Sequence, residues 1–333
     1  MNPLPKRGRL RKLNFYLEVA MRMTITAWTV AVVFGSALLG QGGPVGPAIT
    51  TDLDISGVWN FATLTPRQRP ARFATKPFLT KEEAAALEEE ILAAGNQRLG
   101  SGKVFDEGVW LEQGHWAIVN GRYLSSLVSD PADGRVPELT QAAKARLADR
   151  ATALARSNGP EDRTLSERCL RSAKGPPMFP SPDSNIVQII QNRDHVLLIT
   201  EKFHEARIIP LDSPPRPNRA LRSWTGDSQG HWEGKTFVVD TSNFTGKIGL
   251  TGPFDENLHL VELFTRTSPS ALLYEVRIGD STAFTAPWSV VVPMTRTSEP
   301  RLEFACHEGN YSLPNILKAA RAAEQFDGTR RRR

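Results

Sequence analysis

Alternation of apolar and polar residues in the second half of the chain predicts a series of short β-strands. From Asn185 onward, runs rich in Val, Ile, Leu and Phe recur between turn residues. Such runs, joined by hairpin-length loops, are typical of an antiparallel sheet. The expected strands are Ile186–Gln191, Val196–Glu201, Glu205–Leu211, Leu258–Thr267, Leu272–Ile278, Trp288–Thr295 and Leu302–Cys306.

The stretch Gly226–Phe244 lies in the middle of this series and predicts a hairpin. A turn is expected at Glu233 and Gly234, because glycine adopts positive φ at little cost and the β-branched and aromatic run Thr236–Val239 follows directly. Similar units lie on both sides, so the hairpin belongs to an antiparallel meander.

The first half of the chain predicts a first strand and then helices. Ile55–Phe61 alternates as a strand, and its Gly-x-Trp motif at Gly57 and Trp59 is typical of lipocalin-like barrels, in which the indole closes one end. Two further strands, Gly108–Val119 and Arg122–Ser129, are expected to pair. The expected helices are Thr80–Ala94, which begins with a capping box, Leu139–Arg156 and Leu313–Gln325.

These elements together predict a mainly β protein. Eight to ten strands with short loops suit an antiparallel meander that closes into a lipocalin-like barrel or a strongly curved sheet, because closure removes exposed edges. About three helices would lie at the periphery. The segments 50–160 and 161–326 are expected to form one structural domain, followed by a disordered basic tail at 327–333.

Composition excludes a disordered chain, and the distribution of charge argues against a surface that binds duplex nucleic acid. The 333 residues are 40% hydrophobic and 23% charged, as in ordinary globular proteins. The formal net charge of +5 comes from the two ends: residues 1–40 hold six basic residues and one acidic residue, and the chain ends in four arginines. The body between these ends is net acidic, so the basic ends do not indicate a nucleic-acid surface.

The amino terminus reads as an export signal. A cationic start precedes the apolar run Thr24–Gly40, and small residues follow where a peptidase could cut. Residues 1–42 are therefore predicted to be a signal peptide, with the mature chain beginning between about residues 41 and 49. An uncleaved anchor is the alternative, since the apolar run is at the short edge of what spans a bilayer. Both alternatives place the rest of the chain in the periplasm or outside the cell.

The cysteine count adds a second expectation for that compartment. The chain has two cysteines, Cys169 and Cys306. An even number in an exported chain favours one disulfide closing a long loop, which would pin the Pro-, Gly- and Ser-rich segment 157–184 to the barrel. Two buried thiols acting as small hydrophobic side chains are the alternative.

Several motifs resemble a large group of exported, functionally uncharacterised bacterial proteins with β-rich, lipocalin-like folds. The resemblance extends over most of the mature chain and implies export and β architecture, without a catalytic assignment. The motifs that carry it are Asp133–Pro137, Arg168–Leu170, Arg207–Asp212, Gly226–Phe244, Glu256–Glu262 and Ala305–Tyr311.

Seven polar residues and Trp232 are the candidates for chemistry or ligand contact. The expected catalytic group is His259, Glu262 and His307, placed at strand positions or strand exits that would flank one end of the barrel. A polar side chain inside a barrel must be paired or bind something, because leaving it unsatisfied costs kilocalories. The expected ligand contacts are His204, Arg207, Asp227, Trp232 and Glu308.

A metal site is not expected. It would need His204, His259 and His307 with Glu308 or Glu262, and no H-x-x-x-H or H-x-H spacing supports that set. No cofactor is expected either, and the chain has no Gly-rich phosphate loop. It also has no Gly-x-Ser-x-Gly motif that would indicate Ser-based acyl transfer. Histidines that only hold loops to the barrel are a structural alternative for each position.

Three function classes stay open on this basis. The favoured hypothesis is an exported protein that binds a small apolar or aromatic molecule inside the barrel. An enzyme of the hydratase, lyase or isomerase type would instead use a His/Glu acid-base pair on an apolar substrate. An envelope interaction module would show a filled barrel and an exposed apolar patch.

Overall fold

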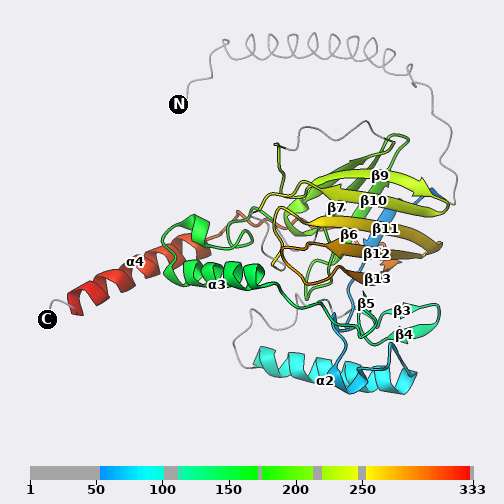
Figure 1. The fold of residues 1–333 in the computed structure, drawn as a ribbon, viewed down its shortest axis with the longest axis horizontal. Coiled ribbons are helices and arrows are strands. Elements are labelled where there is room, and N and C mark those ends of the chain that lie inside the picture. The colour runs from blue at the N-terminus through cyan, green and yellow to red at the C-terminus, as the bar shows by residue number, and fades with distance from the viewer. Residues whose placement is uncertain are drawn as a thin grey trace, which may run out of the picture. The chain divides into compact units, whose positions relative to one another are not determined.

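The main sheet has ten strands, and nine of them follow one another in a single antiparallel order (Figure 1). The computed structural model describes residues 53–100, 112, 114–171, 175–212, 220–246 and 253–330. From one edge to the other the strands are β8 (Ala206–Pro210), β7 (His195–Thr200), β6 (Ile186–Gln191), β1 (Gly57–Asn60), β13 (Trp288–Arg296), β12 (Ala271–Gly279), β11 (His259–Ser268), β10 (Thr236–Ser242) and β9 (Asp227–Glu233).

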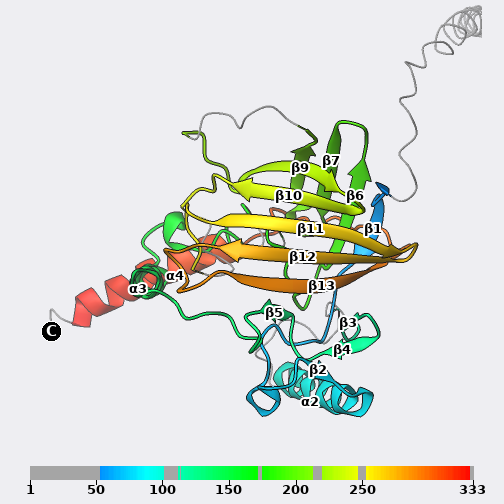
Figure 2. The same cartoon turned by 45° about the vertical axis from the view of Figure 1, so that its right-hand side comes forward.

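The two edge strands of this order, β8 and β9, lie next to each other and nearly close the sheet (Figure 2). Leu211, just after β8, forms a parallel bridge with Gly230 of β9. The N–H of Asp212 also donates to the Gly230 carbonyl at 3.3 Å. The mainly β, barrel-like class predicted from the sequence is therefore confirmed.

Alternation along each strand divides the sheet into an inner and an outer face. On β11 the buried residues Leu260, Glu262 and Phe264 alternate with the more accessible His259 and Val261. Successive side chains of a strand point to opposite faces, so one set packs inward while the other faces outward. The predicted turn at Glu233 and Gly234 joins β9 to β10, with Gly234 at φ 59°.

Smaller elements flank the barrel. The described helices are α2 (Lys81–Gly100), α3 (Gln141–Arg156) and α4 (Ser312–Arg330). A small sheet contains β2 (Phe78–Leu79), β4 (Arg122–Leu124) and β3 (Ile118–Val119), while β5 (Val128–Asp130) pairs with β13 of the main sheet. The predicted capping box opens α2: the N–H of Glu83 donates to Thr80 Oγ1 at 3.2 Å, and the N–H of Thr80 donates to Glu83 Oε2 at 3.0 Å.

Two local predictions near the carboxyl terminus were wrong. Leu302–Cys306 forms no strand, because this segment leaves β13 and turns at Cys306 to meet Cys169. Helix α4 continues to Arg330, into the expected disordered tail, and no proline interrupts its last turns. The predicted signal peptide at 1–42 lies outside the described residues.

The inside of the barrel is filled by aromatic rings and by one loop. Phe264 packs between Phe237 and Tyr274, with ring centroids 6.0 and 5.1 Å away. Met178 and Phe179 of the loop before β6 are buried in the same core. Trp59 is fully buried, as the first-strand motif predicts, and its indole N–H donates to the Ile55 carbonyl at 3.0 Å.

The predicted disulfide joins Cys169 to Cys306, with Cα atoms 5.6 Å apart. It fastens the segment before β6 to the segment after β13, 137 residues later. A disulfide is consistent with an oxidising compartment. Within the described part of the chain, none of the helices combines the length and apolarity needed to cross a membrane.

Alanine substitutions at two glycines should have opposite effects. A Cβ at Gly230 would lie 2.6 Å from the Phe237 ring and 3.0 Å from Ile209 of β8, so Gly230→Ala should lower the free energy of unfolding by about 1–3 kcal/mol. A Cβ at Gly95, inside α2, would meet nothing within 4 Å, so Gly95→Ala should raise it by about 0.5–1 kcal/mol. Urea denaturation measures both, and an unchanged stability for Gly230→Ala would contradict a tightly packed seam.

Candidate functional site

A buried ion pair between Arg207 of β8 and Glu262 of β11 spans the inside of the barrel. The Glu262 side chain is fully buried and that of Arg207 is 7% exposed. The contact is bidentate: Arg207 Nη1 donates to Glu262 Oε1 at 3.1 Å, and Nη2 donates to Oε2. A planar guanidinium suits this fork geometry, which makes such pairs directional as well as strong.

The remaining polar atoms around this ion pair are also satisfied. Arg207 donates to Ser228 Oγ on β9 and to Thr241 Oγ1 on β10, each at 2.8 Å. The Tyr274 hydroxyl of β12 donates to Glu262 Oε1 at 2.9 Å and accepts the N–H of Met178 at 3.1 Å. Burial and the negative charge of Glu262 raise the pKa of Tyr274 well above its ordinary value. The network thus connects strand β8 with β9, β10, β11 and β12.

The expected catalytic group of His259, Glu262 and His307 does not come together. His259 and Glu262 are three positions apart on β11, so they lie on opposite faces. His259 is exposed on the outer face, where its Nε2 lies 2.7 Å from Asp240 Oδ2. The carboxylate of Glu262 accepts hydrogen bonds from Arg207 and Tyr274 inside the barrel.

A second ion pair lies near the first. Arg171 Nε donates to Glu205 Oε1 at 3.0 Å, while Glu205 Oε2 is buried without a hydrogen-bond partner. Burial raises the pKa of Glu205 despite the nearby Arg171 guanidinium. The cavity lined by Glu205 and Arg207 measures only about 10 Å³, roughly the space of one water molecule. This cavity therefore has no room for a small organic molecule.

Outside the barrel, the outer faces of β9, β10 and β11 line a polar groove of about 750 Å³. It contains the pair of His259 and Asp240, together with His231, whose Nε2 lies 2.8 Å from Glu233 Oε1. The lining residues of this polar groove are Arg222, Gln229, His231, Asp240, Ser242, Asn243, Glu256, Asn257, Leu258 and His259.

Two of the expected ligand contacts lie on or beneath this part of the sheet. Asp227 accepts a hydrogen bond from Asn243 Nδ2 at 2.6 Å, beside the polar groove. Trp232 instead packs from the inner side, with its ring 5.3 Å from that of Phe237. Of these two residues, only Asp227 therefore lies next to a solvent-accessible site.

His204, His307 and Glu308 do share a site, a cleft of about 240 Å³ beside the disulfide. Phe203 and His204 both have positive φ there, 61° and 50°. Phe203 packs edge-on against Phe304, with ring centroids 5.1 Å apart. The structure therefore brings together His307 and two of the expected ligand contacts, in a cleft that Glu262 does not line.

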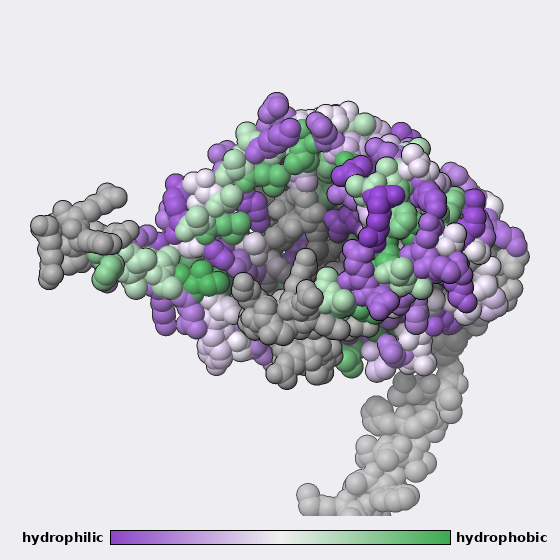
Figure 3. Space-filling model, turned by 90° about the horizontal axis from the view of Figure 1, so that it is seen from below, coloured by the Kyte–Doolittle hydropathy of each residue, from purple (hydrophilic) through white to green (hydrophobic). Residues whose placement is uncertain are grey.

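A third site, the apolar pocket, lies between α2 and the segments that follow β1 and precede β6. It measures about 550 Å³, and its lining residues are Thr63, Leu64, Thr65, Arg67, Gln68, Ile91, Leu92, Gly95, Glu112, Leu127, Pro180, Ser181 and Pro182. Seen from the α2 side, the molecular surface is hollowed, with hydrophobic and hydrophilic residues around the hollow (Figure 3). None of the residues of the apolar pocket was singled out from the sequence.

Arg67 gives the apolar pocket a cationic group. Its guanidinium lies 4.3 Å from the centroid of the Phe179 ring, a cation–π contact. Partial burial lowers the pKa of Arg67, and no carboxylate counters that effect among the described residues. The carboxylate of Glu112, on the same lining, accepts two N–H groups of Asn185, both at 2.9 Å.

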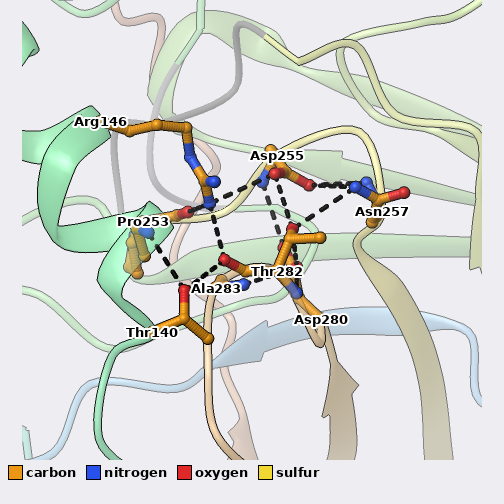
Figure 4. Close-up of polar contacts among 9 residues, drawn as sticks. Thr140, Arg146, Pro253, Asp255, Asn257, Asp280, Thr282 and Ala283 are labelled. Carbon is orange, nitrogen blue, oxygen red and sulfur yellow. Dashed lines mark hydrogen bonds and ion pairs between the residues drawn. The ribbon is translucent and has the colours of Figure 1, made fainter.

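A cluster of polar contacts fastens α3 to the loops at the end of the barrel (Figure 4). Thr282 Oγ1 lies 2.7 Å from both Asp255 Oδ2 and Asp280 Oδ1. Arg146 of α3 forms an ion pair with Asp255 at 3.2 Å, and the Thr140 hydroxyl donates to the Thr282 carbonyl at 2.6 Å. Because its members already bond to one another, the cluster is a structural clamp.

An exposed apolar row crosses the outer face of β6, β7 and β8. The strand register places Ile190 opposite Leu197, and Leu197 opposite Ile208. Ile190 is 45% exposed and Ile208 is 66% exposed. Such rows mark interaction surfaces in some proteins. Nothing among the described residues shows what covers this one.

The partners of the candidates were harder to find in the sequence than the candidates themselves. Asp240 lies on the outward positions of β10 with Ser242, so strand alternation could have placed it on the outer face, but its pairing with His259 on the neighbouring strand depends on the register. Tyr274 and Arg67 gave no such signal, because their roles depend on contacts between distant segments. No group of metal-ligating side chains forms among the residues that the structure describes.

Comparisons with protein families, with characterised proteins and with solved structures found no match to the chain.

Removing one partner of the buried ion pair should be strongly destabilising. Glu262→Gln leaves the Arg207 charge buried without a counterion, so unfolding should become easier by about 3–5 kcal/mol. The double variant Arg207→Met, Glu262→Leu should lose less stability than Glu262→Gln alone, since it leaves neither charge of this pair buried. Asp240→Asn, which breaks the exposed pair with His259, is the control and should cost about 0–1 kcal/mol. Denaturation of the variants side by side would contradict the assignment if Glu262→Gln cost no more than the control.

Tyr274 should also shape stability at alkaline pH. Its pKa is raised in the folded state, so above about pH 10 the Tyr274 hydroxyl ionises in the unfolded chain but not in the folded one. The contribution of Tyr274 to the free energy of unfolding is therefore fully present below pH 10 and is lost as the pH rises further. In an ultraviolet titration of the folded protein, Tyr274→Phe should leave the first tyrosinate absorbance step unchanged. A smaller first step in Tyr274→Phe would contradict the buried position.

Proposed function

We propose that this chain is an exported protein that binds a small molecule with an apolar or aromatic body and an anionic group. The proposed site is the apolar pocket between α2 and the barrel. The observation that carries this proposal is the combination of an apolar lining with Arg67, a cation that meets no carboxylate among the described residues. Small-molecule sites commonly combine apolar walls with a few polar groups that fix orientation.

The chemistry of the lining supports an amphipathic ligand. Leu64, Ile91 and Leu92 offer aliphatic surface, and Pro180 offers a rigid wall. A ligand carboxylate or sulfonate could accept hydrogen bonds from Arg67, whose fork geometry suits planar anions. The volume of about 550 Å³ falls in the range of known small-molecule pockets.

The pocket supports ligand binding better than the barrel interior does. Met178 and Phe179 take up interior space next to Tyr274, and the cavity beside Arg207 measures about 10 Å³. A ligand inside the barrel would have to displace these side chains. The enzyme alternative loses its expected pair for a similar reason, because Glu262 is committed to Arg207.

Export is proposed on two grounds. The amino-terminal sequence has the order of a signal peptide, with a cationic start and then an apolar run. The pair Cys169 and Cys306 forms a disulfide, which persists in oxidising compartments. The ligand would then be met in the periplasm or outside the cell.

Two fluorescent probes that differ in one charge test the binding site. The anionic probe 1-anilinonaphthalene-8-sulfonate and its uncharged relative N-phenyl-1-naphthylamine should both bind with enhanced fluorescence. Arg67→Gln should weaken binding of the sulfonate by about tenfold, the loss of one charge-assisted contact, and leave the uncharged probe unaffected. Leu92→Trp should weaken the binding of both probes, because the larger indole ring occupies part of the pocket.

The matched control is Arg193→Gln, since Arg193 is a surface arginine with a 77% exposed side chain. It should leave the affinity of both probes unchanged. The proposal is contradicted if Leu92→Trp leaves the affinity for both probes unchanged. It is also contradicted if Arg67→Gln and Arg193→Gln weaken binding of the sulfonate probe equally. Melting temperatures of the variants would show whether a lost signal reflects unfolding instead.

A further inference from the structure

The polar groove on the outer face of the sheet has a built shape that an ordinary solvated strand face lacks. Its floor is formed by outward side chains of β9, β10 and β11, which alternate with the inward core residues. Its wall is formed by Arg222 and by the segment Glu256–Leu258. The resulting volume of about 750 Å³ is larger than that of the apolar pocket.

The wall is held in place by contacts with buried or backbone groups. Arg222 Nη1 donates to the carbonyls of Phe244 and Glu256, at 3.1 and 3.2 Å. Asn243, at φ 63°, donates from Nδ2 to the Leu221 carbonyl at 2.8 Å. A site whose walls are fixed before binding loses less freedom when a ligand arrives.

The clamp of Figure 4 holds the same wall from its other side. Asp255, one residue before the wall, is bonded to Thr282 and paired with Arg146 of α3. The Asn257 side chain, which lines the groove, donates from Nδ2 to Asp255 Oδ1 at 3.0 Å. The clamp thus has a use beyond stability, since it orients a side chain of the polar groove.

The ionisable side chains of the lining each lie beside a partner, and that of His231 is Glu233, just outside the lining. Asp240 faces His259 at 2.7 Å, and Glu256 faces Arg222 at 3.6 Å. A ligand would therefore meet paired charges, which favours recognition of a neutral molecule. Nine of the ten lining residues have polar side chains, and the exception, Leu258, is buried. An apolar ligand would displace water from these polar side chains without replacing the hydrogen bonds of that water, which is costly.

We propose that the polar groove is a binding site for a neutral, hydroxyl-rich ligand of the saccharide class. Hydroxyl groups both donate and accept, so they match a lining of amides, imidazoles, hydroxyls and carboxylates. Neighbouring strands bring outward side chains to within about 5 Å of one another, so that one sugar contacts several of them. This site is separate from the apolar pocket and does not depend on the function proposed for it.

Amide signals in nuclear magnetic resonance spectra report on the site directly. Maltotriose, cellotriose and chitotriose are titrated separately to about 10 mM, enough to detect a millimolar dissociation constant. At least one of them should shift the side-chain amide signals of Gln229, Asn243 and Asn257. Gln229→Ala and His259→Ala should each lower the affinity for that sugar by fivefold or more.

The controls are Gln188→Ala and His195→Ala, which change the same residue types at other positions of the same sheet, on β6 and β7. These variants should leave the affinity unchanged. The proposal is overturned if none of the three sugars shifts the groove signals. It is also overturned if the groove variants bind the sugar as tightly as the controls do, with all four variants folded as judged from their spectra.

Discussion

The arginine–glutamate pair inside the barrel is the constraint on which the rest of the sheet depends. Neighbouring antiparallel strands are joined by regular hydrogen-bond ladders, but β8 and β9 share only a short parallel contact. Arg207 bridges that weak seam from the inside by bonding to side chains on β9, β10 and β11. Because a buried charge without a partner is costly, the pair favours the one strand arrangement in which it forms.

This arrangement leaves little free space inside the barrel. The inner face is taken up by aromatic rings, by the Arg207 network and by Met178 and Phe179. The two sites proposed to bind a ligand therefore lie outside the barrel, one beneath α2 and one across β9, β10 and β11. Their linings differ, since one is largely apolar with a single arginine and the other is polar with matched charges.

The sequence predicted the strands well because their pattern is local. Hairpin turns, the capping box at Thr80 and the alternation in β11 can all be read within a few residues. The site could be predicted only in part. His259 was found as a polar residue on a strand, but its partner Asp240 was not, because pairing depends on the register between strands. The apolar pocket was missed because its walls are far apart in the chain.

The position of β1 has a consequence for the order in which the chain can fold. Its Trp59 lies opposite Val187 of β6 on one side and Arg296 of β13 on the other. β1, the first of the described strands, therefore finds one of its two neighbours only after the twelve later described strands have been made. Such distant pairing is slow to form and leaves strand edges open meanwhile. A chain that is kept unfolded until synthesis ends, as exported chains commonly are, avoids closing the sheet around a gap where β1 belongs.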